Sequence, residues 1–281
     1  MVGGEIVSAD SMAVYTGMDI GTAKPTAEER ARATFHAIDV ADPAEPFSVG
    51  EFQRLAGAAI DAIVDSNPPA IVVGGSGLYV KAAIDGLNLD IPERSDQLRA
   101  ALAEEAARYG NDHVHRRLAE IDPESAERIH PNNLKRVIRA IEIFELSGTP
   151  ASETFRRDNR SAHPNAQWFG LTMNRETLYQ RIEKRIDVMI EAGLVEEVAS
   201  LMKRGIDPRV TSMQGLGYKE IAGFLRGEYG IEEAVALLKG NTRRFAKRQY
   251  TWFRADSRIR WIDVEGMTAK DVSKIISGNV A

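Results

Sequence analysis

The sequence EIVSADS, residues 5–11, opens the chain with a short apolar run that leads directly into small, hydroxyl and acidic residues. Such a run predicts a buried strand centred on Ile6 and Val7. Ligands of α/β proteins bind at the carboxyl ends of parallel strands. Asp10 follows this strand, where a carboxylate can act as a general base. The alternative role for Asp10 is to cap the turn after the strand.

A second apolar run, AIVV at residues 70–73, leads into the glycine-rich turn GGSG at residues 74–77. Its unbroken apolar character predicts a parallel strand that is covered on both faces. Between the two runs, residues 48–64 have apolar side chains at helical spacing, and Ser48 with Glu51 forms a candidate capping box. A further strand is predicted at residues 35–40. Together these elements predict a right-handed βαβ unit and an α/β fold with a parallel sheet.

The middle of the chain changes to helical patterns alone, and strand patterns return near the end. We predict an α/β core with C-terminal helices at residues 1–94 and 166–281. The region between them, residues 95–165, is predicted to be an all-helical insertion that ends in a polar linker. In the second part of the core we expect strands at 166–173 and 259–263, with long helices between them at 175–204, broken near Gly193, and at 231–253.

Composition narrows the class of protein. The 281 residues are 43% hydrophobic and 27% charged, which is typical of a globular, soluble chain. No apolar run is long enough to span a bilayer, and no secretion signal opens the chain. The chain has no cysteine, which excludes disulfides and thiolate zinc sites. We therefore expect a cytoplasmic protein without a membrane partner. A net charge of −5 argues against indiscriminate nucleic-acid binding but permits a local basic patch.

Two glycine-rich segments could approach a ligand closely. GMDIGTAKP, residues 17–25, has glycines and a lysine but lacks the G-x-x-x-x-G-K-[ST] spacing of a phosphate loop. It is either part of the lining of a site or a turn-rich loop with a solvated Lys24. The GGSG turn lets backbone approach a ligand closely, or it is a tight turn between a strand and a helix.

Two basic regions could bind anions. Arg181 and Arg185 lie four residues apart on one helical face, either as an anion site or as part of a solvated charged surface. Residues 241–261 combine seven basic side chains with five aromatic ones. Basic and aromatic side chains in one segment are typical of a nucleic-acid interface, although some of these aromatic residues could instead be core.

Several motifs together resemble the tRNA dimethylallyltransferases, also called tRNA isopentenyltransferases. They are EIVSADS, GGSGLY from Gly74, SMQGLGYKE at residues 212–220 and KRQYTWFR at residues 247–254. The resemblance covers nearly the whole chain. It implies a P-loop-NTPase-like parallel sheet with a helical insertion. It also implies transfer of a dimethylallyl group from dimethylallyl diphosphate to N6 of adenosine 37, beside the anticodon of tRNA, with Mg²⁺ helping the diphosphate to leave.

The resemblance also assigns roles to single residues. It makes Asp10 the base that takes the proton of the attacking amine, and it assigns the leaving pyrophosphate to Arg185 first and Arg181 second. Two positions depart from the family pattern: Ala13 stands where many relatives have Gln, and Ser76 where they have Thr. The tRNA contacts that it implies are Asp10, Ser11, Met12, Ala13, Ser76, Asn132, Asn133, Leu134, Lys135, Arg136, Gln214, Gly215, Leu216, Gly217, Tyr218, Lys219, Lys247, Arg248, Gln249, Tyr250, Thr251, Trp252, Phe253 and Arg254.

The family has a Walker A loop directly upstream of EIVSADS, and no such motif occurs in residues 1–281. We therefore expect the first strand of the sheet and its phosphate loop to be missing, either because the true start lies upstream or because the chain is truncated. The partners expected are the anticodon stem-loop of tRNA and dimethylallyl diphosphate, bound by a monomer. Two other functions stay open: a catalytically impaired tRNA-binding protein, and an isopentenyltransferase for free adenine nucleotides.

Overall fold

The computed structural model describes residues 3–66, 68–89, 92–155 and 161–278. The chain divides into two compact units: an α/β unit of Met1–Asp85 and His163–Ala281, and a helical unit of Gly86–Ala162. The insertion was predicted at 95–165, so the helical unit begins and ends a few residues earlier. Half of the predicted linker, residues 156–160, lies outside the described residues.

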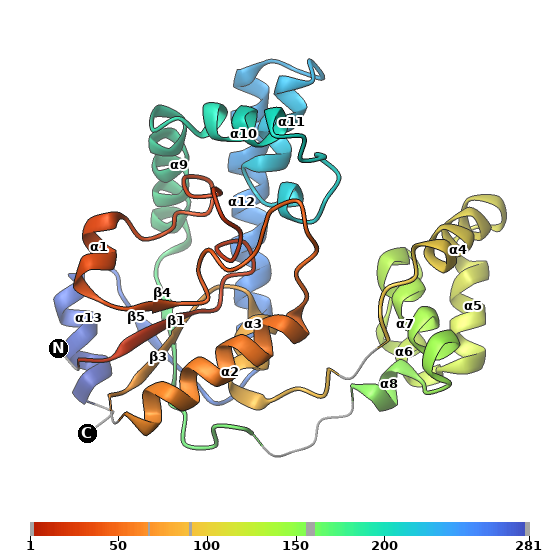
Figure 1. The fold of residues 1–281 in the computed structure, drawn as a ribbon, viewed down its shortest axis with the longest axis horizontal. Coiled ribbons are helices and arrows are strands. Elements are labelled where there is room, and N and C mark those ends of the chain that lie inside the picture. Colours follow the sequence, from red (N-terminus) through yellow and green to blue (C-terminus); the bar gives the residue numbers. More distant parts are fainter. Residues whose placement is uncertain (1–2, 67, 90–91, 156–160, 279–281) are drawn as a thin grey trace. The chain divides into compact units, whose positions relative to one another are not determined.

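The α/β unit contains two parallel sheets (Figure 1). Its first half consists of β1 (Glu5–Ser8), α1 (Ala27–Arg32), β2 (Phe35–His36), α2 (Val49–Asp65), β3 (Ala70–Val73) and α3 (Gly77–Asp85). Its second half consists of β4 (Trp168–Thr172), α9 (Arg175–Glu191), α10 (Leu194–Lys203), the short 3-10 turn η1 (Ser212–Gln214), α11 (Tyr218–Leu225), α12 (Ile231–Arg254), β5 (Ile259–Asp263) and α13 (Ala269–Gly278).

Strand β1 is the centre of the first sheet, whose order is β2-β1-β3. Ile6 pairs with Phe35 on one side and with Ile71 on the other, all in parallel. The prediction of a strand over residues 35–40 is too long. Ala37 and Asp39 have φ angles of 60° and 57°, in the left-handed region, and this backbone cannot continue a strand.

The second sheet is a parallel pair in which Trp168 of β4 lies opposite Ile259 of β5. Among the described strands, β3 and β4 each have a hydrogen-bonded neighbour on one side only. Val73 on β3 and Leu171 on β4 are 55% and 53% exposed, high values for apolar side chains on strands. The fold class is therefore α/β with parallel strands, as the sequence predicted, but the strands form two sheets.

Helix α2 shows how closely the local sequence determines an element. Ser48 and Glu51 form the predicted capping box, with distances of 3.1 Å and 2.7 Å for its two hydrogen bonds. The buried face of α2 includes Phe52 and Ile60, which follow the helical period. The ring of Phe52 lies 4.3 Å from that of Tyr79 in α3, and α2 packs beside β1 and β3 (Figure 1).

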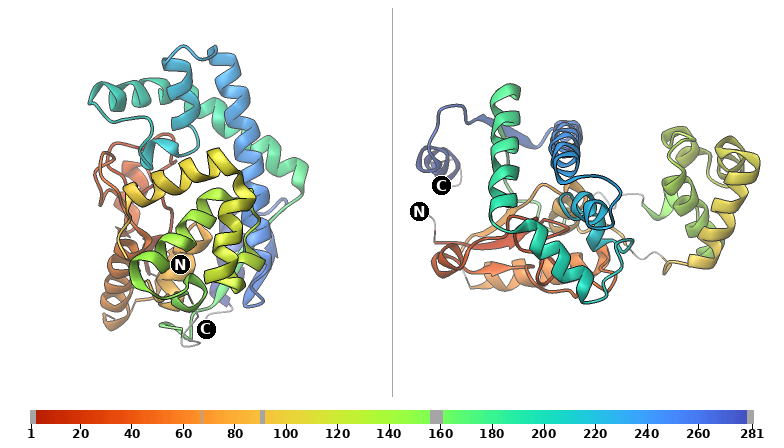
Figure 2. Two further views of the ribbon diagram at one scale, coloured as in Figure 1. Left: turned by 90° about the vertical axis from the view of Figure 1, so that its right-hand side faces the viewer. Right: turned by 90° about the horizontal axis from the view of Figure 1, so that it is seen from above.

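Helices α9 and α12 lie alongside each other in the second half of the unit (Figure 2). Ion pairs join them: Arg243 with Glu183, and Lys239 with Asp187 at 2.5 Å. Over the ranges that the structure describes, no helix is both long and apolar enough to cross a membrane.

The helical unit has a core of its own, formed by residues such as Leu102, Leu118 and Ile141. Glu142 is buried beside this core, where it accepts hydrogen bonds from both Arg99 and Arg139. The helices of this unit are α4 (Asp96–Tyr109), α5 (Asn111–Ile121), α6 (Pro123–Arg128), α7 (Leu134–Ser147) and α8 (Ala151–Thr154).

We predict that Glu142→Gln destabilises the helical unit by about 3 kcal/mol, because the two arginines lose their charged partner. Burial alone would raise the pKa of Glu142, but the hydrogen bonds from Arg99 and Arg139 outweigh it and lower the pKa to about 2. Its contribution to stability is therefore full above the ordinary pKa of 4.5 and is lost as the pH falls toward 2. Urea unfolding followed by circular dichroism at pH 7 and pH 3 measures both effects.

Glu145→Gln is the matched control, because Glu145 lies on the same helix as Glu142 but forms its ion pair at the surface, with Arg117 of α5. It should change the free energy of unfolding by less than about 1 kcal/mol. Equal effects of the two substitutions would contradict the role given to Glu142.

Candidate functional site

Asp10 lies where the chain leaves the carboxyl end of the central strand β1. Its Oδ1 accepts hydrogen bonds from the backbone N–H groups of Met12, at 2.8 Å, and Ala13, at 3.4 Å. The predicted cap is therefore present. It uses one carboxylate oxygen, and no hydrogen bond to the other is described within the structured ranges. Asp10 is half-buried, while Ala13 is buried. A capped carboxylate has a defined direction, and its second oxygen can still accept a proton.

The turn after β3 meets the turn after β1. Ser11 donates its backbone N–H to Oγ of Ser76 at 3.2 Å, and the two hydroxyl oxygens lie 3.1 Å apart. The approach is close because Gly74 has no side chain: a Cβ there would lie 2.2 Å from the carbonyl oxygen of Ala9. The sequence predicted that carboxyl ends of parallel strands gather ligand-binding groups, and here they place Asp10, Ser11 and Ser76 together.

Helix α12 packs its basic and aromatic segment directly on this turn. Gln249 donates from Nε2 to the carbonyl oxygen of Gly75 at 3.0 Å. A Cβ on Gly77 would lie 2.0 Å from Nε1 of Trp252. Glycine at these two positions therefore brings residues of KRQYTWFR within contact of the GGSG turn. These contacts place the two motifs beside each other.

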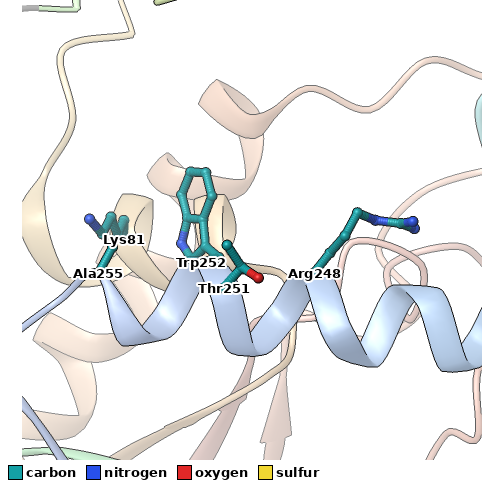
Figure 3. A pocket seen from close by; sticks show the side chains of 5 residues that line it. All are labelled: Lys81, Arg248, Thr251, Trp252 and Ala255. Atoms are coloured by element: carbon teal, nitrogen blue, oxygen red, sulfur yellow. The ribbon is translucent and has the colours of Figure 1, made fainter.

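An open hollow of about 390 Å³ lies beside this contact (Figure 3). Arg248, Thr251 and Trp252 line it from α12, Ala255 lines it directly after that helix, and Lys81 lines it from α3. The ammonium group of Lys81 lies 5.7 Å from the centre of the Trp252 ring. Trp252 is 41% exposed. An exposed indole can stack on a base, and the cationic groups beside it can attract a phosphate. Lys81 could not be predicted from the sequence, because nothing but its place shortly after GGSG distinguishes it.

The remaining residues of KRQYTWFR divide between surface and packing. Lys247, Arg248, Thr251 and Arg254 are exposed, whereas Tyr250 and Phe253 are half-buried. Tyr250 stacks on Trp261 of β5 with ring centres 5.8 Å apart, and the guanidinium group of Arg254 lies over the Tyr250 ring, 5.2 Å from its centre. The predicted basic surface is thus present, whereas the aromatic side chains of this segment are half-buried or, for Trp252, exposed, and do not form a buried core.

The segment 212–220 touches the turn that holds Asp10. A Cβ on Gly215 would lie 2.6 Å from Cε of Met12, so this glycine allows the contact. Gln214 is exposed and donates to the carbonyl oxygen of Pro208 at 2.8 Å. Gly217 has a φ of 91°, which only glycine adopts without strain. Of the other residues of the motif, Leu216 and Lys219 are half-buried, and Tyr218 is fully buried at the start of α11.

Lys24 in the loop 17–25 is buried, so the alternative of a solvated lysine is wrong. Its ammonium group donates to the carbonyl oxygen of Tyr15 at 2.6 Å, to Asp19 at 2.8 Å and to Asp39 at 2.5 Å. All three protons of an ammonium group are then used, which leaves none for a phosphate. Lys24 holds the loop together, in agreement with the absence of phosphate-loop spacing.

Arg181 and Arg185 are both exposed on α9. Nη1 of Arg181 lies 3.9 Å from Sδ of Met173, and no contact of either arginine with Asp10 is described in the structured ranges. They form the charged surface that was one of the two predicted alternatives. Their proposed role toward a pyrophosphate is untested by this arrangement.

The weaker basic motif lies in the helical unit, at the start of α7. Asn132, Asn133, Lys135 and Arg136 are exposed there, and Leu134 packs against the core of that unit. The exposed side chains could contact a nucleic acid.

A site for the expected Mg²⁺ is not formed by side chains in the described ranges. Within them, no three or more His, Cys, Asp and Glu residues lie close enough to hold a metal ion. No chemical step below is assigned to a metal held by protein side chains alone.

The sequence matches a known protein family and several of its members. A sequence model described as "IPP transferase" matches residues 13–256. A tRNA dimethylallyltransferase of Desulforudis audaxviator is 52% identical over 264 residues, with 94% of this chain and 84% of that protein covered. That of Desulforamulus reducens is 46% identical, with 98% and 99% covered.

Solved structures show the same likeness. The full-length tRNA isopentenylpyrophosphate transferase of Bacillus halodurans matches with a TM-score of 0.71 and 43% identity, over 99% of this chain and 88% of that one. A eukaryotic dimethylallyltransferase, described as acting on tRNA, matches with a TM-score of 0.79 and 25% identity. That match covers 99% of this chain and 73% of the eukaryotic chain.

We predict that Gly77→Ala displaces Trp252 and destabilises the α/β unit by about 1–3 kcal/mol, because the new methyl group overlaps the indole. Tryptophan emission should shift as the ring moves, and urea unfolding gives the loss of stability. Gly240→Ala is the matched control, since Gly240 lies in α12 with open space around its Cα. It should stabilise the helix by up to about 1 kcal/mol. Unchanged emission and stability in Gly77→Ala would contradict the packing described here.

Proposed function

The chain belongs to the IPP transferase family, and on that premise we propose that it transfers a dimethylallyl group to tRNA. The observation that carries the proposal is the junction of EIVSADS, GGSG and KRQYTWFR. Ser11 contacts Ser76, and Gln249 contacts Gly75, so the turn that holds Asp10 and the basic, aromatic segment of α12 meet at one sheet edge. The relatives in this family are named for this reaction.

Asp10 is the proposed general base for N6 of adenosine 37. The amine attacks the allylic carbon, the bond from that carbon to the diphosphate oxygen breaks, and the amine proton passes to Asp10. The carboxylate oxygen without the Met12 hydrogen bond is the proposed acceptor. An exocyclic amine is a weak nucleophile, so an acceptor within hydrogen-bond distance both orients it and removes its proton. The base must leave its stack to reach this place, which requires base flipping.

The leaving diphosphate is assigned first to Arg185 and second to Arg181. A guanidinium group makes strong, charge-assisted hydrogen bonds to phosphate oxygens and stabilises the negative charge that develops there. Both side chains are exposed. We likewise propose dimethylallyl diphosphate as the donor of the prenyl group and Mg²⁺ as the metal ion that assists the departure of diphosphate. Most ligands of Mg²⁺ at such a site would be phosphate oxygens and water.

The RNA surface of the α/β unit is proposed to combine α12 with the segment 212–220. In the helical unit, the exposed side chains at the start of α7 are proposed as a further tRNA contact. Lys247, Arg248 and Arg254 supply positive charge along α12, where a phosphate backbone can follow them. Trp252 supplies a ring on which a base can stack. A small nucleotide substrate needs no surface of this extent, and this favours tRNA.

We predict that Asp10→Asn lowers single-turnover dimethylallyl transfer by about 10²–10⁴-fold while the affinity for an anticodon stem-loop stays within a few-fold. Asparagine keeps an oxygen that can accept from Met12, so the turn is retained and only proton acceptance is lost. The assay compares transfer of labelled prenyl groups with filter binding of the stem-loop. Near-normal transfer would make Asp10 a structural cap, and a catalytically idle wild type that binds tRNA would point to a tRNA-binding protein.

We also predict that replacing Lys247, Arg248 and Arg254 by alanine weakens stem-loop binding. The slope of log K against log salt should fall by about two to three, because up to three phosphate contacts are lost. Lys270 and Lys274 on α13 provide the control, since they are exposed lysines outside the motifs. Their replacement should leave the slope unchanged. A salt titration in which both sets behave alike would remove α12 from the RNA surface.

A further inference from the structure

Glu197 makes an unusual set of contacts for a side chain on the surface helix α10. Its Oε2 accepts the backbone N–H groups of Asp19, at 2.9 Å, and Ile20, at 2.8 Å. Its Oε1 accepts the N–H of Gly21 at 3.2 Å and the hydroxyl of Tyr218 at 2.6 Å. One carboxylate thus binds three successive N–H groups of the loop 17–25 and a tyrosine of the segment 212–220.

These contacts continue to Asp10 through touching groups. Gly21 lies against the ring of Tyr218, where a Cβ would be 2.5 Å from Cε2. Tyr218 is fully buried, and a Cβ on Gly215 would lie 3.4 Å from its ring. The same Cβ on Gly215 would lie 2.6 Å from Cε of Met12. The N–H of Met12 donates to Oδ1 of Asp10 at 2.8 Å.

We infer that Glu197 is a positioning residue: its carboxylate fixes Tyr218 and the loop 17–25, and through Gly215 and Met12 it sets the place of Asp10. This inference rests on the proposed function for its catalytic consequence. Hydrogen bonds to a charged acceptor are among the stronger ones in proteins, and four of them converge here. Burial and the hydrogen bond to Glu197 both raise the pKa of Tyr218, so its hydroxyl stays protonated as the donor.

The test compares Glu197→Gln with Glu196→Gln. Glu196 is exposed in the same turn of α10, and no hydrogen bond or ion pair is described for it within the structured ranges. Both substitutions remove one negative charge from this turn, but only the first alters the acceptor of the loop. Tyr218→Phe is the second variant, because it keeps the buried ring and removes only the hydroxyl.

The first readout is hydrogen exchange of the peptide that contains Met12 and Ala13. We expect faster exchange there in Glu197→Gln and, to a smaller degree, in Tyr218→Phe, with Glu196→Gln like the wild type. Faster exchange at residues 19–21 alone, without change at Met12, would overturn the inference, because Glu197 would then only brace its own loop. This readout does not depend on activity.

The second readout is single-turnover transfer to tRNA, measured well below the unfolding temperature. Glu197→Gln should transfer about tenfold more slowly, and the double variant with Tyr218→Phe should lose less than the product of the two single losses. A normal rate in Glu197→Gln beside an active wild type would overturn the positioning role and leave the proposed function intact. An inactive wild type and an inactive Glu196→Gln would instead reject the proposed function, while exchange at Met12 would still decide the coupling.

Discussion

The rest of the structure depends on how closely the backbone approaches itself at the carboxyl ends of β1 and β3. Ala9 donates its N–H to the carbonyl oxygen of Val73 at 2.7 Å, and Gly74 leaves no room for a Cβ beside Ala9. This contact decides where both turns go. It places Asp10 at the edge of the sheet and exposes the next glycines to α12. A larger residue at Gly74 would separate the two turns and with them the parts of the site.

Local signals explain most of what could be predicted from the sequence. The capping box of α2, the apolar run of β3 and the unbroken pattern of α12 are each determined by nearby residues, and the structure has all three elements. The strand at residue 35 was predicted too long because Ile38 and Val40 look like strand residues. The left-handed backbone at Ala37 and Asp39 follows from tertiary contacts, since Lys24 and Arg30 both bind the carboxylate of Asp39.

The site follows the same division. Asp10 and Ser76 could be located because strand ends have a recognisable sequence, and their hydroxyl and carboxylate groups lie in the turns as expected. Glu197 and Lys81 could not be located from the sequence, because each contacts a segment that is far away in the chain. Lys24 shows the reverse case: a lysine in a glycine-rich loop suggested an exposed cation, yet its three acceptors come from backbone and carboxylates that only the folded loop brings together.

The helical unit leaves the α/β unit and returns to it at neighbouring points. His163 donates its N–H to the carbonyl oxygen of Ile84 at 3.1 Å, and Arg258 holds Asp85 beside this junction. The two ends of the interruption are thus already joined by hydrogen bonds within the α/β unit, while the helical unit carries its own core. Such an arrangement is modular in the evolutionary sense: whole helices can be gained, exchanged or shortened between these points, and the chemistry of the sheet edge need not change with them.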